Sequence, residues 1–277
     1  MALSCAENIY KKILVSLDIV PQMAWRTAEL NENKKSVSKI RKACYNVYNR
    51  QLERSDFLSI KLEVWGDYAL FTRPEMKTER VSYDVMTPSA ARGILEAIFW
   101  HPGLVYRIDR IRVCAPIRFT NVRRNEVKST VNLRSAGMVM NKGQGELYIA
   151  TSEDIQQRAA MILRNVHYVI EAHFDMTAQA APSDNPGKFC DIIRRRIEKG
   201  AFYHQPYFGT REFPVYFAPC KSIPPCPVEL RGRHDLGFML WDMDYTRKGD
   251  IRPLFFRALI EDGVLRVPTR DSGEVIG

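Results

Sequence analysis

From residue 57 onward, hydrophobic and polar positions alternate in patterns that predict strands separated by helices. In the segment IKLEV (60–64) every second residue is hydrophobic and the others are charged, which predicts a strand over 57–65. The same alternation predicts strands over 104–114 and 166–174. A period of two residues places one face of each strand in a core and leaves the other face polar.

Two helices are expected between these strands from their capping residues. Thr87 is an N-cap candidate and is followed by Pro88 and an apolar stripe, so a helix is predicted over 87–100. The second has Asp184 or Asn185 as its cap, Pro186 in its first turn and Gly200 just past its end. Helices are also expected from Ser152 or Glu153 to about residue 163, and over 251–261.

The order and lengths of these elements predict an α+β fold with a ferredoxin-like, RRM-like βαββαβ unit over 57–200. The remainder, 201–277, is expected to be a small antiparallel β region with strands at 213–217, 236–245 and 264–267. Residues 1–56 have helix-like spacing at 7–19 and 38–52 and form an expected helical extension. That extension is either non-native, from an upstream start codon, or a protein- or RNA-contacting element.

Composition narrows the function classes. The 277 residues carry a formal net charge of +9, which makes a polyanion a candidate partner. No apolar run is long enough for a transmembrane helix and no secretion signal is evident, so a cytoplasmic location without membrane contact is expected. The six cysteines contain no CxxC pair and the histidines show no ligand spacing, and no P-loop is present. We expect neither a metal site nor a cofactor.

The amino-acid sequences of several segments are more specific than the order of strands and helices that they predict. WGDYALFTRPE (65–75), VSYDVMTPSAARGILEAIFW (81–100), PIRFTNVRRNEV (116–127), NPGK (185–188) and DLGFMLWDMDY (235–245) resemble the CRISPR-associated Cas-five family, d variant. The resemblance covers about 57–277 and implies a RAMP protein, the pre-crRNA processing and crRNA-holding subunit of subtype I-C Cascade. It implies the pre-crRNA repeat, the Cascade backbone and large subunits and, indirectly, target DNA as partners.

Basic residues gather where an RNA contact is expected. The segment from Arg107 to Arg134 has eight Lys/Arg and two Asp/Glu, a local net of +6. Its part from Arg118 to Arg134 lacks strong hydrophobic periodicity, which predicts a loop or a protruding hairpin. The resemblance implies that about 115–150 is the family's RNA-gripping thumb. The candidate RNA contacts are Arg73, Lys77, Arg80, Arg118, Arg123, Arg124, Lys128, Arg134 and Arg194. The alternative is a solvated charged face.

Metal-free RNA cleavage needs a base, an acid and a cation. The resemblance implies a Tyr or His in the pattern LEAI-x-W and a Lys-His pair in N-x-G-K-H. This chain has Phe99 at the first position, and Lys188 followed by Phe189 at the second. It therefore keeps the cation and lacks both proton-transfer groups, for which His101, His204 and Tyr203 are possible substitutes. A non-catalytic Cascade scaffold and a generic RNA- or DNA-binding RAMP protein remain alternatives.

Overall fold

The computed structural model describes residues 59–76, 78–246 and 249–277. The chain divides into two units, Met1–Asp56 and Phe57–Gly277. The predicted helical extension over 1–56 lies outside the described residues, as does the candidate RNA contact Lys77.

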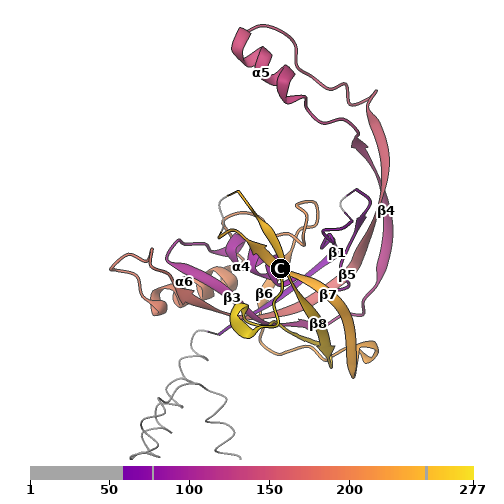
Figure 1. Ribbon diagram of the computed structural model, residues 1–277. Coiled ribbons are helices and arrows are strands. Elements are labelled where there is room, and N and C mark those ends of the chain that lie inside the picture. Colours follow the sequence, from indigo (N-terminus) through magenta and orange to yellow (C-terminus); the bar gives the residue numbers. More distant parts are fainter. Residues whose placement is uncertain (1–58, 77, 247–248) are drawn as a thin grey trace, which may run out of the picture. The chain divides into compact units, whose positions relative to one another are not determined.

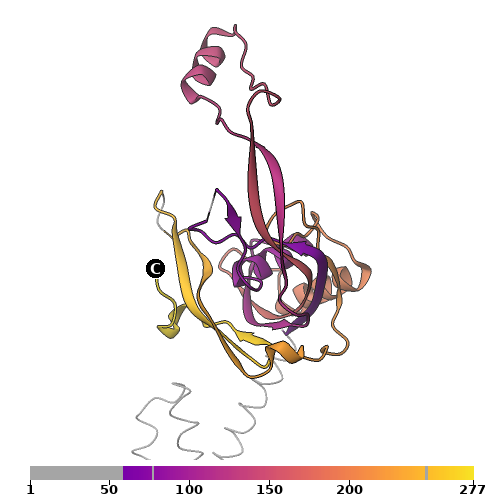
Figure 2. The same ribbon diagram turned by 90° about the vertical axis from the view of Figure 1, so that its right-hand side faces the viewer.

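In the described part of the chain, nine strands form one mostly antiparallel sheet in an α+β fold, as predicted (Figures 1 and 2). The neighbour order is β6-β1-β5-β3-β9-β8-β7, and β2 and β4 also pair with β5. The strands are β1 (Ile60–Ala69), β2 (Arg80–Val81), β3 (Leu104–Val113), β4 (Phe119–Val127), β5 (Ile155–Met176), β6 (Tyr216–Pro219), β7 (Arg233–Asp244), β8 (Arg252–Glu261) and β9 (Val264–Arg266). Strand β9 links β3 to β8 and β7, so the C-terminal strands continue the sheet that the earlier strands begin.

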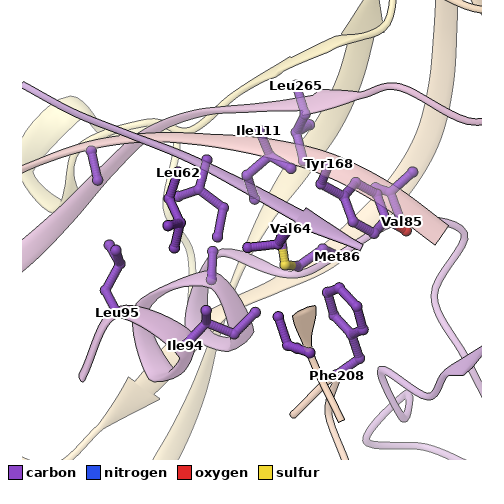
Figure 3. Packing of buried hydrophobic residues seen from close by; sticks show 14 of the residues in the cluster. Leu62, Val64, Val85, Met86, Ile94, Leu95, Ile111, Tyr168, Phe208 and Leu265 are labelled. Atoms are coloured by element: carbon purple, nitrogen blue, oxygen red, sulfur yellow. The ribbon is translucent and has the colours of Figure 1, made fainter. Parts of the chain in front are cut away.

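Helix α4 (Pro88–Ile98) closes one side of the main core. The backbone N–H of Ala90 donates to Thr87 Oγ1 at 3.3 Å, which confirms the predicted cap. The apolar stripe of the helix faces the core, where its Ile94 lies in one buried cluster with Leu62 of β1 and Ile111 of β3 (Figure 3). Burial of this stripe is what holds the helix against the sheet.

Helix α6 (Pro186–Lys199) also begins and ends where the sequence predicts. Asn185 is its cap, since its side-chain oxygen accepts from the Lys188 backbone N–H at 2.9 Å. Gly200 ends the helix with a φ of 63°, a conformation that glycine adopts without strain. Phe189, Ile193 and Ile197 lie one turn apart and point into the core.

The helix expected from residue 152 to 163 is wrong, because residues 155–163 belong to β5. The stretch QQRAAMIL has high helix propensity, which misled the prediction. Each residue from 155 to 163 instead pairs with β4, in a register that runs from Val127↔Ile155 to Phe119↔Leu163. Propensity differences are a few tenths of a kcal/mol per residue, so a continuous ladder of strand hydrogen bonds overrides them.

The helix expected over 251–261 is also wrong, because these residues form β8. Burial alternates with a period of two along Leu254, Phe256, Ala258 and Ile260. A two-residue turn then leads into β9: Asp262 and Gly263 have φ angles of 49° and 76°. Asp-Gly between hydrophobic segments is a strong hairpin signal, and it should have outweighed the helix-like spacing.

Residues 119–163, which we call the arm, extend away from the rest of the sheet (Figures 1 and 2). The arm is the hairpin of β4 and the first part of β5, with α5 (Leu133–Lys142) at its far end. Of the two alternatives predicted for 118–134, a loop or a protruding hairpin, the hairpin is confirmed over residues 119–127, which form β4. Asn165, with a φ of 52°, marks the point where β5 passes from the arm into the sheet.

Two short 3-10 helices, η1 (Val228–Leu230) and η2 (Arg270–Ser272), complete the described elements. No helix among the described residues is both long and apolar enough to cross a membrane.

Candidate functional site

The end of α4 and the start of α6 meet at two phenylalanine rings. Phe99 is the residue at which α4 ends, and Phe189 lies in the first turn of α6. Their ring centroids are 6.0 Å apart, and Phe189 is 1% exposed and Phe99 8%. The two positions singled out in the sequence are therefore adjacent in space, and both hold groups that cannot transfer a proton.

Lys188 lies on the solvent side of this junction. Its Nζ donates to Asp184 Oδ1 at 2.8 Å, and its side chain remains about half exposed. The hydrogen bond from Lys188 holds the pKa of Asp184 below its usual range, with a second contribution from the Ala181 backbone N–H. An exposed ammonium at a helix N-terminus is suited to an anionic ligand, although here it first has to leave Asp184.

His101 lies against both phenylalanines. Its ring centroid is 5.0 Å from that of Phe189 and 6.5 Å from that of Phe99. The backbone N–H of Gly103 donates to His101 Nδ1 at 3.0 Å, which assigns the proton of the neutral ring to Nε2. Nε2 lies 3.9 Å from Asp184 Oδ2. In this tautomer the ring has no free lone pair, so His101 is not placed to act as a base.

Arg196 is a member of this junction that the sequence analysis missed. Its guanidinium carbon lies 5.2 Å from the centroid of the Phe99 ring, and its NH1 donates to the Ile98 carbonyl at 2.6 Å. The expected contact, Arg194, points elsewhere and pairs with Asp191 at 2.7 Å. Arg196 follows Phe189 by seven residues, two helical turns, and that spacing places both on one face.

Tyr203 and His204 reach the same region through their backbone. The N–H groups of both donate to the Ala97 carbonyl, at 2.8 and 3.3 Å, so they are tied to the last turn of α4. Their rings contact each other edge to face at 5.8 Å, and Tyr203 is 81% exposed. The structure brings the backbone of these two candidates to the junction, and leaves the Tyr203 side chain in solvent.

A basic cavity of about 560 Å³ continues along the outer face of α6 from Lys188. Arg194 and Arg195 line it together with Asp191 and Ile192. Three cations against one carboxylate favour a phosphate there.

The candidate contacts near β2 have partners within the protein. Arg73 pairs with Asp84 at 3.0 Å and lies over the ring of Tyr83, and Arg80 pairs with Glu126 at 3.4 Å. Tyr83 is 2% exposed, so it is a core residue and not a platform for a nucleobase. These arginines stabilise the contact between this loop and its neighbours.

The arm is different, because most of its basic side chains are unpaired. Arg124 is held by Glu212 at 2.6 Å and lies over the ring of Phe213. Three further expected contacts on the arm, and Arg118 directly before it, are exposed and make no ion pair with any residue that the structure describes; the three are Arg123, Lys128 and Arg134. These four side chains are available to a polyanion.

The family model described as CRISPR-associated protein (Cas_Cas5), in its Cas5d form, matches residues 59–268. The chain belongs to this family. It is 47% identical over 221 residues to the CRISPR pre-crRNA endoribonuclease Cas5d of Mannheimia succiniciproducens, covering 78% of this chain and 97% of that protein. It is 38% identical over 234 residues to the protein of the same name from Thermus thermophilus, covering 78% and 94%.

Solved structures agree with this Cas5 fold. A crystal structure of a CRISPR-associated protein superposes with a TM-score of 0.55 at 21% identity, covering 79% of this chain and 96% of that chain. A functionally uncharacterized protein from Streptococcus mutans gives 0.56 at 21% identity, covering 79% and 97%. At this identity the likeness extends to the fold alone.

Within this Cas5 fold, the residues described show no group of three or more His, Cys, Asp or Glu side chains arranged to hold a metal ion. The strand histidines are satisfied by carboxylates: His167 Nε2 lies 2.8 Å from Glu63, and His173 Nδ1 lies 2.9 Å from Asp109. Glu171 on the same strand face pairs with Arg110 and Arg112. These side chains form structural pairs across the strands.

Proposed function

We propose that this chain is the crRNA-binding Cas5 subunit of a subtype I-C CRISPR Cascade, which binds the pre-crRNA repeat and holds the 5′ handle. The main support is the relative at 47% identity, 97% of whose length is matched and which is named a pre-crRNA endoribonuclease. The net charge of +9 and the four unpaired basic side chains on and next to the arm provide the electrostatic means of binding RNA.

We also propose that the first part of the fold is ferredoxin-like, which would suit this function. Apart from the two-residue β2 and the arm elements β4 and α5, strands and helices follow one another as β1, α4, β3, β5, α6 and β6, which is a β-α-β-β-α-β order. All neighbours in the series β6-β1-β5-β3 are antiparallel. The same topology is expected of RRM-like RNA-binding domains.

Protein partners are proposed for the far end of the arm. Helix α5 buries none of its residues, and Leu133, Met138 and Met140 are 84%, 54% and 83% exposed. Exposed apolar groups of this kind are typical of protein contacts. We assign this surface to the Cascade backbone subunit, with the large subunit and target DNA met within the same cytoplasmic complex.

The junction of α4 and α6 is proposed to bind the repeat but to cleave it slowly or not at all. Cleavage without a metal requires removal of the 2′-OH proton and protonation of the departing 5′ oxygen. Phe99 and Phe189 can do neither, and His101 Nδ1 is occupied by the Gly103 N–H. Lys188 can stabilise the charge that develops on the phosphate once it has left Asp184.

An active endoribonuclease is the second candidate, favoured by the names of both curated relatives. It would need Tyr203 or His204, whose backbones are tied to α4, to move a side chain onto the phosphate. A non-catalytic scaffold that receives crRNA processed elsewhere fits the phenylalanine pair better.

The deciding experiment incubates the full chain with its cognate repeat hairpin in EDTA and measures binding and cleavage separately. Tight binding with little or no cleavage supports the proposal. Rapid EDTA-resistant cleavage would contradict it, and alanine at His101, Tyr203 and His204 would then identify the active group. Failure to co-purify with a repeat RNA of uniform length and with other Cascade subunits would instead favour a generic RNA- or DNA-binding role.

A further inference from the structure

A second cavity, of about 430 Å³, lies where the arm leaves the sheet. Trp65 and Asp67 of β1 line it together with Asn165 and His167 of β5. Glu63, two residues before Trp65, completes the wall on the same face of β1. The cavity thus lies beside the turning point of β5 and is remote in sequence from the α4–α6 junction.

The indole of Trp65 gives this cavity an exposed π surface. Trp65 stacks on Tyr216 of β6 with ring centroids 6.3 Å apart and an interplanar angle of 25°. Trp65 also meets the edge of His167 at 6.5 Å. Trp65 is 39% exposed and Tyr216 55%, so neither ring is used to fill the core. A large indole kept at the surface by its neighbours is suited to bind a flat or cationic group.

The charge of this cavity is opposite to that of the chain. Its lining contains two carboxylates and neither a lysine nor an arginine, although the chain carries +9 overall. Glu63 is hydrogen-bonded to His167 at 2.8 Å. Asp67 makes no ion pair with the described residues. Phosphates of an RNA backbone are repelled here, whereas a cation gains both from the carboxylates and from the face of Trp65.

We propose that this cavity binds an arginine or lysine side chain presented by a protein partner. The cation lies over the indole of Trp65, and Glu63 and Asp67 accept its N–H groups. Of the two cations, arginine fits better, because its planar guanidinium can stack on the indole while it donates to a carboxylate. This proposal does not depend on RNA binding or on catalysis, so its failure would not affect the proposed function, and failure of the proposed function would not affect it.

The test uses the full chain labelled with 5-fluorotryptophan. The four tryptophans of the chain should then give separate ¹⁹F signals. Trp65→Phe identifies the Trp65 signal, and the signal of Trp100, 60% exposed and outside the cavity, is the internal control. The probe is the tripeptide amide Gly-Arg-Gly. The same peptide with citrulline has nearly the same shape without the charge.

We expect Gly-Arg-Gly amide to shift the Trp65 signal saturably in the millimolar range, and the citrulline peptide to leave it unchanged. The pair Glu63→Gln with Asp67→Asn should weaken the effect about fivefold or more. The pair Glu146→Gln with Glu229→Gln removes the same charge from exposed positions outside the cavity and should change nothing.

Two results would overturn the proposal. A Trp65 signal that responds to the neutral nucleosides adenosine or cytidine and not to the arginine peptide would make the cavity a nucleobase site. A Trp65 signal that responds equally to the arginine and citrulline peptides, or to neither, would show that the carboxylates do not select a cation.

Discussion

The burial of Phe99 and Phe189 limits which residues able to transfer a proton can replace them. Phe189 is 1% exposed and packs on Phe99, His101 and Phe174. A polar ring at this position would lose its hydrogen bonds to water and would lie among aromatic rings. Phe99 is closer to the surface, and Arg196 lies over its ring. A tyrosine hydroxyl at residue 99 is therefore easier to accommodate than an imidazole at residue 189.

The first prediction concerns this pair. Phe99→Tyr together with Phe189→His should raise repeat cleavage in EDTA by at least ~10²-fold, the lower end for general acid–base catalysis. The pair should also lower stability by roughly 1–3 kcal/mol, mainly through the buried imidazole. Single-turnover cleavage and thermal unfolding measure the two effects.

Lys188→Ala provides the control for that gain. Added to the double variant, it should remove most of the new activity, because the phosphate loses its cation. The gains of the two single variants should be far from additive, since groups that act as one unit fail together. A double variant that remains inert while folded and RNA-bound would refute the assignment of these positions.

His173 supplies a prediction about pH. Its hydrogen bond with Asp109 raises the pKa of the imidazole in the folded state. A raised folded-state pKa means that the pair stabilises fully below the unfolded value of ~6.5, and that this contribution is lost as the pH rises through the folded pKa. Replacement by glutamine should therefore cost more stability at about pH 6 than at about pH 8.5.

Chemical unfolding of wild type and His173→Gln at both pH values measures this difference. Asp109→Asn should show the same dependence on pH. His204→Gln, at an exposed position with no carboxylate partner among the described residues, should show none. A cost that does not vary with pH would mean that the pair does not persist in solution.

Single residues differed in how far the sequence specified them. The caps Thr87 and Asn185 and the terminator Gly200 were predictable, since capping depends on local chemistry. The pairing of Arg73 with Asp84 was not, because the partners of a long basic side chain depend on the tertiary fold. Arg196 could have been found from its two-turn spacing after Phe189.

Among the elements, the arm allows two neighbouring arginines to be compared. On β4, Arg123 points to the exposed face, whereas Arg124 is held between Glu212 and Phe213. Arg123→Ala should flatten the slope of log K against log salt for repeat RNA by about 1, the value for one lost phosphate contact. Arg124→Ala should change the slope less and stability more.

Arg233→Ala is the matched control, because it removes one exposed positive charge from β7, outside the arm. It should leave the slope almost unchanged. Equal slopes for Arg123→Ala and Arg233→Ala would show that the arm is a solvated face and not an RNA contact.

The two elements predicted wrongly share a physical cause. Residues 155–163 and 252–261 have hydrophobic spacing compatible with a helix, and their strand identity depends on pairing with β4 and β7. Such pairing is a non-local interaction that a window of ten residues does not contain. The Asp262-Gly263 turn was a local signal that the prediction overlooked.

On the scale of the whole molecule, the sequence predicted the α+β class and an excess of positive charge but not its distribution. Unpaired cations lie on and next to the arm, while the cavity beside Trp65 is acidic. Formation of that cavity needs β1 and β5 to lie side by side, so no single segment reveals it. The phenylalanine junction was accessible only because the resemblance named its positions.

The last prediction concerns residues 1–56, which precede both the family match at 59–268 and the second of the two units of the chain. Removing them deletes ten Lys/Arg and six Asp/Glu and leaves +5 of the +9. Because the described core cluster of the second unit runs from Ile60 to Leu265, the chain 57–277 should unfold at nearly the same temperature as the full chain. It should also bind repeat RNA. Its slope of log K against log salt should equal that of the full chain, unless the first unit contacts phosphates, in which case the slope should be lower. Insolubility of 57–277, or a melting temperature lowered by ~10 °C or more, would show that residues 1–56 belong to the core and that the proposed boundary is wrong.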